Sequence, residues 1–141
     1  MTATTDRTRA AVRKFLATLA EGDPDRVAAL FAERVDWVIA ENPAARWIRP
    51  RSTRGDVAAH FRELAEGVRP YAGGNTVDAI VVEGTEAMLT GQLAGTIRAT
   101  GRPYRSPFAM RLTVEDGLIT RYHLYEDSLA IATACAPGSP Q

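Results

Sequence analysis

Two ionisable side chains in the sequence are placed to exchange protons beside apolar neighbours. His60 falls on the apolar stripe of a helical stretch, where an imidazole can titrate near neutral pH. Glu126 shares one face of an extended stretch with Tyr122 and Leu124, and burial there would raise the pKa of its carboxyl, which suits a general acid. Each has a structural alternative, because a core histidine can be satisfied by one hydrogen bond and a strand end can leave a glutamate in solvent.

Glu41 is a third candidate acid. It continues the alternation of Val35, Trp37 and Ile39 and would enter the same cavity from the opposite wall, unless it faces solvent at the strand end. Aromatic side chains are expected to shape the pocket and bind the substrate: Trp37, Trp47, Phe15, Phe61, Tyr104, Phe108 and Tyr122. Trp47 lies in a loop with two prolines, where an indole either covers a pocket or plugs one end of the core.

Several other chemistries are not expected. His60 and His123 lie on different elements without HxxxH or HxH spacing, so no metal site is predicted. No glycine-rich phosphate loop follows a strand, so neither nucleotide binding nor any other cofactor is expected. The 17 basic and 17 acidic residues cancel, which argues against nucleic acid and membrane surfaces as partners. No apolar run approaches a membrane span and the N-terminus lacks a signal core, so a cytoplasmic location is expected.

The elements that must position these side chains can be read from the periodicity. Amphipathic helices are predicted over residues 6–21, over a short segment from Pro24 that buries Phe31, and over a segment from Thr53 to Arg69. Strands are predicted over 35–40, 76–83 and 86–99, and in two arms of the stretch 104–128 that join at Gly117.

Local signals refine this order of elements. Asp23, Thr53 with Asp56, and Asp127 are predicted helix caps. Gly91 and Gly95 lie inside a long strand and indicate bends or bulges that let a sheet curl. The segment 128–134 should dock on the sheet, and residues 137–141 should be disordered.

The predicted fold is α+β: a cone-shaped half-barrel of a curved antiparallel sheet, with N-terminal helices covering the concave face and a cavity at the mouth. A single domain is expected over residues 1–141, with an ordered core of about 6–135.

Three segments within this order of elements indicate a family: LATLAEGDPDRVAALFAERVDW, RSTRGDVAAHF and EDGLITRYHLYEDS. With them the chain resembles the nuclear transport factor 2-like superfamily from about Thr8 to Ala134. Within it, the chain is most similar to SnoaL-like polyketide cyclases and their ketosteroid isomerase relatives. The superfamily includes isomerases, cyclases, epoxide hydrolases and non-catalytic binding modules. The resemblance also implies a homodimer through the open sheet face that carries Arg121, His123 and Tyr125.

The family's catalytic residues do not carry over to this chain. The steroid isomerase tyrosine falls on Phe15, its general base on or near Ile39, and its protonated aspartic acid on Phe108, so that activity is not expected. The catalytic aspartate of limonene epoxide hydrolase falls on Leu124, with Glu126 on the same face two residues later.

Two functions follow as hypotheses. The first is a cofactor-independent acid–base enzyme that closes a ring, opens an epoxide or isomerises an apolar polyketide- or terpenoid-like substrate. In this enzyme Glu126 and His60 would divide the proton-donor and proton-acceptor roles. The second is a non-catalytic module of the same fold that binds a small molecule or a partner protein.

Overall fold

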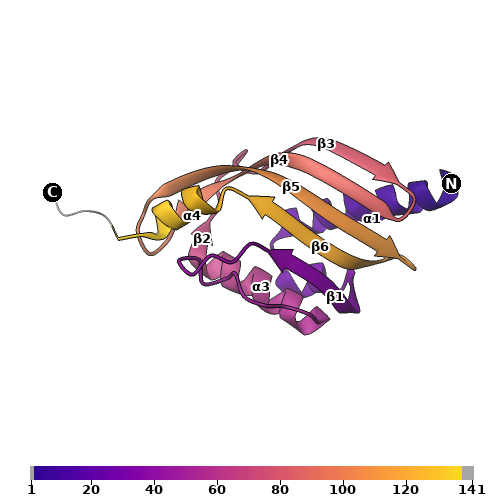
Figure 1. Ribbon diagram of the computed structural model, residues 1–141, viewed down its shortest axis with the longest axis horizontal. Coiled ribbons are helices and arrows are strands. Elements are labelled where there is room, and N and C mark those ends of the chain that lie inside the picture. The colour runs from indigo at the N-terminus through magenta and orange to yellow at the C-terminus, as the bar shows by residue number, and fades with distance from the viewer. Residues whose placement is uncertain (1, 138–141) are drawn as a thin grey trace.

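The computed structural model describes residues 2–137 and has the predicted α+β architecture (Figure 1). Its helices are α1 (Thr2–Glu21), α2 (Pro24–Ala28), α3 (Arg54–Gly67) and α4 (Ser128–Cys135). Its strands are β1 (Phe31–Ile39), β2 (Val68–Arg69), β3 (Thr76–Glu83), β4 (Glu86–Ile97), β5 (Pro103–Glu115) and β6 (Leu118–Glu126). The sheet curls over α1 and α3, and α4 lies at the opposite end of the sheet from the start of α1.

The sheet is mixed, whereas the sequence predicted an antiparallel one. Its order is β1-β6-β5-β4-β2. Strand β3 also pairs with β4, on the same edge as β2 but along a different part of the strand. The strands β3 to β6 form an antiparallel meander, but β1 runs parallel to β6, with Trp37 opposite Tyr122. Alternation along a strand reports only which face is buried, so it carries no information on the direction of a distant neighbour.

The predicted helix caps are all present. The Asp23 carboxylate accepts hydrogen bonds from the backbone N–H groups of Asp25 and Arg26, and Pro24 occupies the first turn of α2. Thr53 and Asp56 form a reciprocal capping box at the start of α3. The Asp127 carboxylate accepts from the N–H of Ala130 at the start of α4. These side chains satisfy N–H groups that have no partner inside a helix, which is why the helices begin where they do.

The element boundaries differ from the predictions at several points. Helix α1 already begins at Thr2, and Phe31 begins β1 instead of ending the second helix. Helix α3 ends at Gly67, because Val68 leaves the helix and pairs with Ile97 on β4. Pairing with a distant strand thus overrides the helical periodicity of this residue. Of residues 137–141, which the sequence predicts to be disordered, residues 138–141 lie outside the described part of the chain.

Of the glycines predicted to mark turns and irregularities, Gly117 lies in a turn, but β4 keeps an unbroken register with β5 at both Gly91 and Gly95. Glu115 pairs with Leu118, so the β5–β6 hairpin has a two-residue turn in which Asp116 (φ 51°) and Gly117 (φ 78°) are both left-handed. Gly91 faces a register shift in β3, and a Cβ at this position would overlap the Thr76 carbonyl oxygen. The bulge itself therefore lies in the partner strand, and the glycine allows the two backbones to approach.

The core lies between the helices and the concave face of the sheet. Val12 and Phe15 of α1, Val57 of α3 and the inward residues of the strands form one buried cluster. A second, smaller cluster joins Trp47, Val68 and Ile97 with residues of α4 at the end of the sheet. No helix within residues 2–137 is long and apolar enough to span a membrane.

Candidate functional site

The concave face of the sheet is filled by aromatic rings. Trp37 stacks on Tyr122 with 4.3 Å between ring centroids, and Phe15 and Phe31 pack against Tyr122 at 6.2 Å and 6.1 Å. The His60 ring packs against the Trp37 ring in an edge-to-face arrangement, with 4.7 Å between the ring centroids. Of the residues expected to line a cavity, Phe15, Trp37, Phe108 and Tyr122 belong to the buried core, and Phe61 packs against it while partly buried. Tyr104 is partly buried beside the second cluster, which contains Trp47. The packed rings thus occupy the inner part of the cone.

Glu126 is the ionisable group that the fold places at the margin of this cluster. It is the last residue of β6 and lies opposite Phe108, on the same face as Leu124 and Tyr122. Burial raises the pKa of its carboxyl to about 7. No hydrogen bond or ion pair to this side chain occurs within residues 2–137. At neutral pH a large fraction of Glu126 is therefore the neutral acid, which can donate a proton.

Two tyrosines adjoin this carboxyl. Burial raises the pKa of Tyr104 to about 12, and the negative charges of Glu126 and Cys135 add to the effect. Burial also raises the pKa of Tyr122, again with a contribution from Glu126. Both phenols therefore remain neutral near pH 7 and could donate hydrogen bonds.

His60 is buried, with 2% of its surface exposed, and its Nδ1 lies 3.0 Å from the carbonyl oxygen of Trp47. Because a carbonyl only accepts, Nδ1 carries the proton and the neutral tautomer leaves Nε2 bare. Burial lowers the pKa of His60 to about 4. The expectation that this imidazole titrates near neutral pH is therefore wrong, because removal from water, together with the nearby charge of Arg51, disfavours the cation more than the Trp47 carbonyl and Glu63 stabilise it.

Glu41 does not join Glu126. Strand β1 ends at Ile39, so the alternation that would turn Glu41 inward is not continued, and the side chain is exposed. The next side chain, Asn42, is buried instead and donates a hydrogen bond to the carbonyl of Ser128. This bond ties the loop after β1 to the start of α4.

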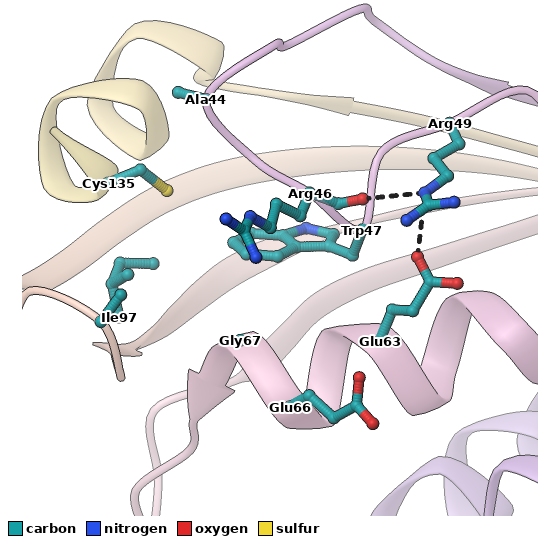
Figure 2. Close-up of a pocket in the computed structure, with 10 residues that line it drawn as sticks. Ala44, Arg46, Trp47, Arg49, Glu63, Glu66, Gly67, Ile97 and Cys135 are labelled. Carbon is teal, nitrogen blue, oxygen red and sulfur yellow. Dashed lines mark hydrogen bonds and ion pairs between the residues drawn. The ribbon is translucent and has the colours of Figure 1, made fainter.

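Trp47 packs in the core and also lines a pocket, whereas the sequence left these two roles open as alternatives. Its indole is 7% exposed and belongs to the second cluster, with Val68 and Ile97. Its carbonyl accepts hydrogen bonds from His60 and, at 3.1 Å, from the Arg51 guanidinium. The same indole lines a surface pocket of about 480 Å³ between the loop, the end of α3, the end of β4 and Cys135 (Figure 2).

This pocket was not predicted from the sequence. Its wall uses Gly67, where a Cβ would lie 2.8 Å from two carbons of the Trp47 ring, so the glycine leaves room for the indole. A glycine at a helix end ordinarily indicates only a stop signal, and the local sequence does not show the ring that packs on it. A second pocket of about 380 Å³ lies between α1 and the β5–β6 hairpin, and neither pocket is lined by His60 or Glu126.

The outer face of the sheet carries a separate polar network. The Asp36 carboxylate accepts a hydrogen bond from Arg121 Nε at 3.0 Å and lies 3.0 Å from His123 Nε2, and these two neighbours, His123 first, lower the pKa of Asp36. His123 is thus on the opposite face from His60. Within residues 2–137 no group of three His, Cys, Asp or Glu side chains is placed to hold a metal ion.

Solved structures with this fold come from several bacterial proteins. A nuclear transport factor 2-like protein from Burkholderia xenovorans LB400 is 24% identical, covers 94% of this chain and 98% of its own, and has a TM-score of 0.79. A candidate polyketide cyclase from Xanthomonas campestris pv. campestris is 21% identical over 94% of this chain and 99% of its own, with a TM-score of 0.74. An epoxide hydrolase of limonene type from M. tuberculosis is 20% identical over 93% and 90%, with a TM-score of 0.69.

These likenesses establish the fold, and a family model establishes the family. No curated protein matches the sequence significantly. The sequence model of the SnoaL-like domain matches residues 12–122, a range that runs from within α1 into β6 and ends before Glu126. The chain belongs to the family of SnoaL-like domains.

Proposed function

We propose that this SnoaL-like protein is a cofactor-independent acid–base enzyme for an apolar small molecule of the polyketide or terpenoid type. Its reaction would be a ring closure, an epoxide opening or an isomerisation. The observation that carries the proposal is Glu126, a carboxyl on the concave face whose pKa is raised to about 7 by burial. A group that is partly protonated at neutral pH both gives and takes a proton readily.

In the proposed reaction the neutral Glu126 donates its proton to a carbonyl or epoxide oxygen on which negative charge develops. In an epoxide opening or ring closure, a water molecule or a nucleophilic group of the substrate forms the new bond. The proton that it loses, or the proton lost from carbon in an isomerisation, returns to the carboxylate and restores the starting state. Tyr104 and Tyr122 would offer neutral hydrogen-bond donors nearby. His60 as the second proton-exchanging group stays a prediction, since its neutral form leaves only the Nε2 lone pair for this role.

The test is the substitution Glu126→Gln, assayed for product on a panel of epoxide and polyketide substrates. Gln keeps the shape of the side chain but cannot exchange a proton, so turnover should fall roughly 10²- to 10⁴-fold. The matched control is Glu41→Gln, which removes an exposed carboxylate from the same end of the sheet and should leave turnover unchanged. His60→Gln in the same assay measures whether the imidazole takes part.

Full turnover in the Glu126→Gln protein would show that this carboxyl is not catalytic. A drop of the same size in the Glu41→Gln control would point to a general effect of charge instead. A pH profile separates the roles further, because a general acid with a pKa near 7 loses activity as the pH rises above that value.

A non-catalytic binding module is the second candidate, and the packing of the concave face favours it. Aromatic rings occupy the inner part of the cone, and neither pocket described above contains both His60 and Glu126. In this case a ligand from the same substrate panel would bind stoichiometrically, and no product would form in either the wild-type or the Glu126→Gln protein.

We also propose that the protein forms a homodimer through its outer sheet face. Val38, Met88, Val81 and Tyr125 are exposed there by 40 to 65% of their surface. Val38 pairs with His123, His123 with Arg111, Arg111 with Met88 and Met88 with Val81, so these residues form one row across the sheet. Exposed apolar side chains at both ends of this row, with the paired charges of His123 and Arg111 between them, suit a second copy of the same face, related by twofold symmetry.

A further inference from the structure

The backbone directly after Glu126 is fixed by polar side chains on both sides of β6. On the β5 side, the N–H of Asp127 donates a hydrogen bond of 2.8 Å to the Ser106 hydroxyl. On the β1 side, the amide of Asn42, in the loop after β1, donates one of 3.0 Å to the carbonyl of Ser128, the first residue of α4. Because β6 lies between β1 and β5, the chain is tethered on both sides at the point where the strand ends.

The Ser106 hydroxyl extends the β5–β6 ladder by one position. The paired residues of this ladder end with Phe108 and Glu126. At the next position the residue on β5 is Pro107, which has no backbone N–H to donate to Asp127. The hydroxyl bridges the two strands here, since it accepts from the Asp127 N–H and donates to the Pro107 carbonyl at 2.7 Å. Ser106 has no exposed surface, so solvent does not compete for these hydrogen bonds.

The backbone must orient the Glu126 carboxyl, because this group has no partner of its own. No hydrogen bond or ion pair within residues 2–137 holds it, and burial raises its pKa to about 7. The ionisable groups beside it are the phenols of Tyr104 on β5 and Tyr122 on β6, which burial keeps neutral near pH 7. A frayed strand end would let the carboxylate turn toward water, which solvates it better than the apolar margin of the core does.

We infer that Ser106 and Asn42 are positioning residues for Glu126: by fixing the two residues that follow it, they keep its carboxyl on the concave face. Both side chains are buried, and their hydrogen bonds go to the backbone after Glu126 or, from Ser106, to the neighbouring carbonyl. The inference concerns the carboxyl of the proposed function, but only its effect on turnover rests on that function.

The test follows the Glu126 carboxyl by NMR in protein labelled with ¹³C at the glutamate Cδ, and the signal is assigned by its loss in Glu126→Gln. Wild type should titrate near pH 7. Ser106→Ala removes both hydrogen bonds of the hydroxyl, so the midpoint should move toward the ordinary 4.5 by about one pH unit or more. Asn42→Ala should move it in the same direction, because it releases Ser128.

A second substitution at Ser106 guards against a simple loss of folding. Ser106→Cys keeps a side chain of similar size, but its thiol is only a weak donor and acceptor. It should therefore shift the midpoint in the same direction as Ser106→Ala without leaving a cavity. Faster exchange of the Asp127 amide hydrogen in both variants would show that the strand end has been released.

The matched control removes a buried hydroxyl elsewhere in the chain. Thr8 is buried, and its hydroxyl donates to the carbonyl of Gly84 at 2.6 Å, which ties α1 to the β3–β4 turn. Thr8→Val keeps the shape of the side chain and loses this bond, so it should lower stability in urea unfolding and leave the Glu126 midpoint unchanged. Equal shifts in Thr8→Val and Ser106→Ala would indicate general loosening of the fold and overturn the positioning role.

The kinetic consequence is separable from the titration. If Glu126 is the catalytic acid, the high-pH limb of the kcat profile should move to lower pH in Ser106→Ala, while KM stays unchanged. A wild-type midpoint in both Ser106→Ala and Asn42→Ala would overturn the inference whatever the turnover. Full turnover of Glu126→Gln would instead overturn the acid–base proposal and leave the shifted midpoint as support for the positioning role.

Discussion

At the scale of single residues, burial moves two ionisable groups in opposite directions and makes both neutral near pH 6. It raises the pKa of Glu126 to about 7 from its ordinary 4.5, and it lowers that of His60 to about 4 from 6.5. In each case the charged form is the one that the apolar surroundings disfavour. Both groups must therefore make folding stability depend on pH.

The sign of each effect follows from which state holds the proton. Between about pH 4.5 and pH 7 the folded protein keeps the Glu126 proton that the unfolded chain has lost, so stability falls as the pH rises through this range. Between about pH 6.5 and pH 4 the unfolded chain protonates His60 while the folded protein does not, so stability falls as the pH drops. The two contributions favour a stability maximum in mildly acidic solution.

We predict that Glu126→Gln removes the loss of stability at higher pH. Relative to wild type, the free energy of unfolding of this variant should rise by up to about 3 kcal/mol between pH 4.5 and pH 8. Urea unfolding across this range measures the difference, and the His60 contribution cancels because both proteins contain it. Glu41→Gln is the control with an exposed carboxylate. Parallel curves for wild type and Glu126→Gln would show that Glu126 is not buried as described.

At the scale of elements, strands β3 and β4 approach each other closely at Gly91. Gly91 lies where β3 shifts its register, and the Thr76 carbonyl occupies the space that a side chain would need. Gly55 in the first turn of α3 provides a contrast, because a Cβ there would meet nothing closer than the Thr53 hydroxyl at 3.8 Å.

The same substitution should therefore have opposite effects at the two glycines. Gly91→Ala should destabilise the protein by about 2 kcal/mol or more, because the strands must separate. Gly55→Ala should stabilise it by about 0.5 kcal/mol, because alanine restricts the unfolded chain without strain in the helix. Thermal and urea unfolding measure both. A Gly91→Ala protein as stable as wild type would mean that the strands do not need this close approach.

At the scale of the whole molecule, the proposed dimer would cover the outer face of the sheet. Tyr125 and Val81 are exposed by 53% and 65%, and the charges beside them are already paired within the chain. Sedimentation equilibrium should show a dimer for the wild type. Tyr125→Glu combined with Val81→Glu should shift it to a monomer with an unchanged circular dichroism spectrum, since both side chains lie outside the core.

The control for the dimer is Leu129→Glu, which adds one carboxylate at an apolar residue of α4 that is 77% exposed but lies off the sheet. That variant should remain a dimer. A monomeric wild type, or dissociation by the Leu129 substitution alone, would contradict the use of this face.

Much of the candidate site follows from local periodicity. The alternation along β5 and β6 assigned Phe108 and Tyr122 to the buried face and Glu126 to the same side, because a strand has a period of two whatever surrounds it. The same pattern failed for Glu41, since a strand's period says nothing about where the strand ends. His60 was rightly assigned to the apolar stripe of α3, but its pKa depends on rings from β1 and on a carbonyl of the loop.

The amino-acid sequence by itself determined the caps, the turn at Gly117, the buried faces and the family, since each rests on interactions within a few residues or on a pattern along the chain. Only the tertiary structure decided that β1 runs parallel to β6, that aromatic rings close the inner cone, and that Trp47, Gly67 and Cys135 enclose a pocket. These features depend on how side chains from distant segments share one volume, which no local period records.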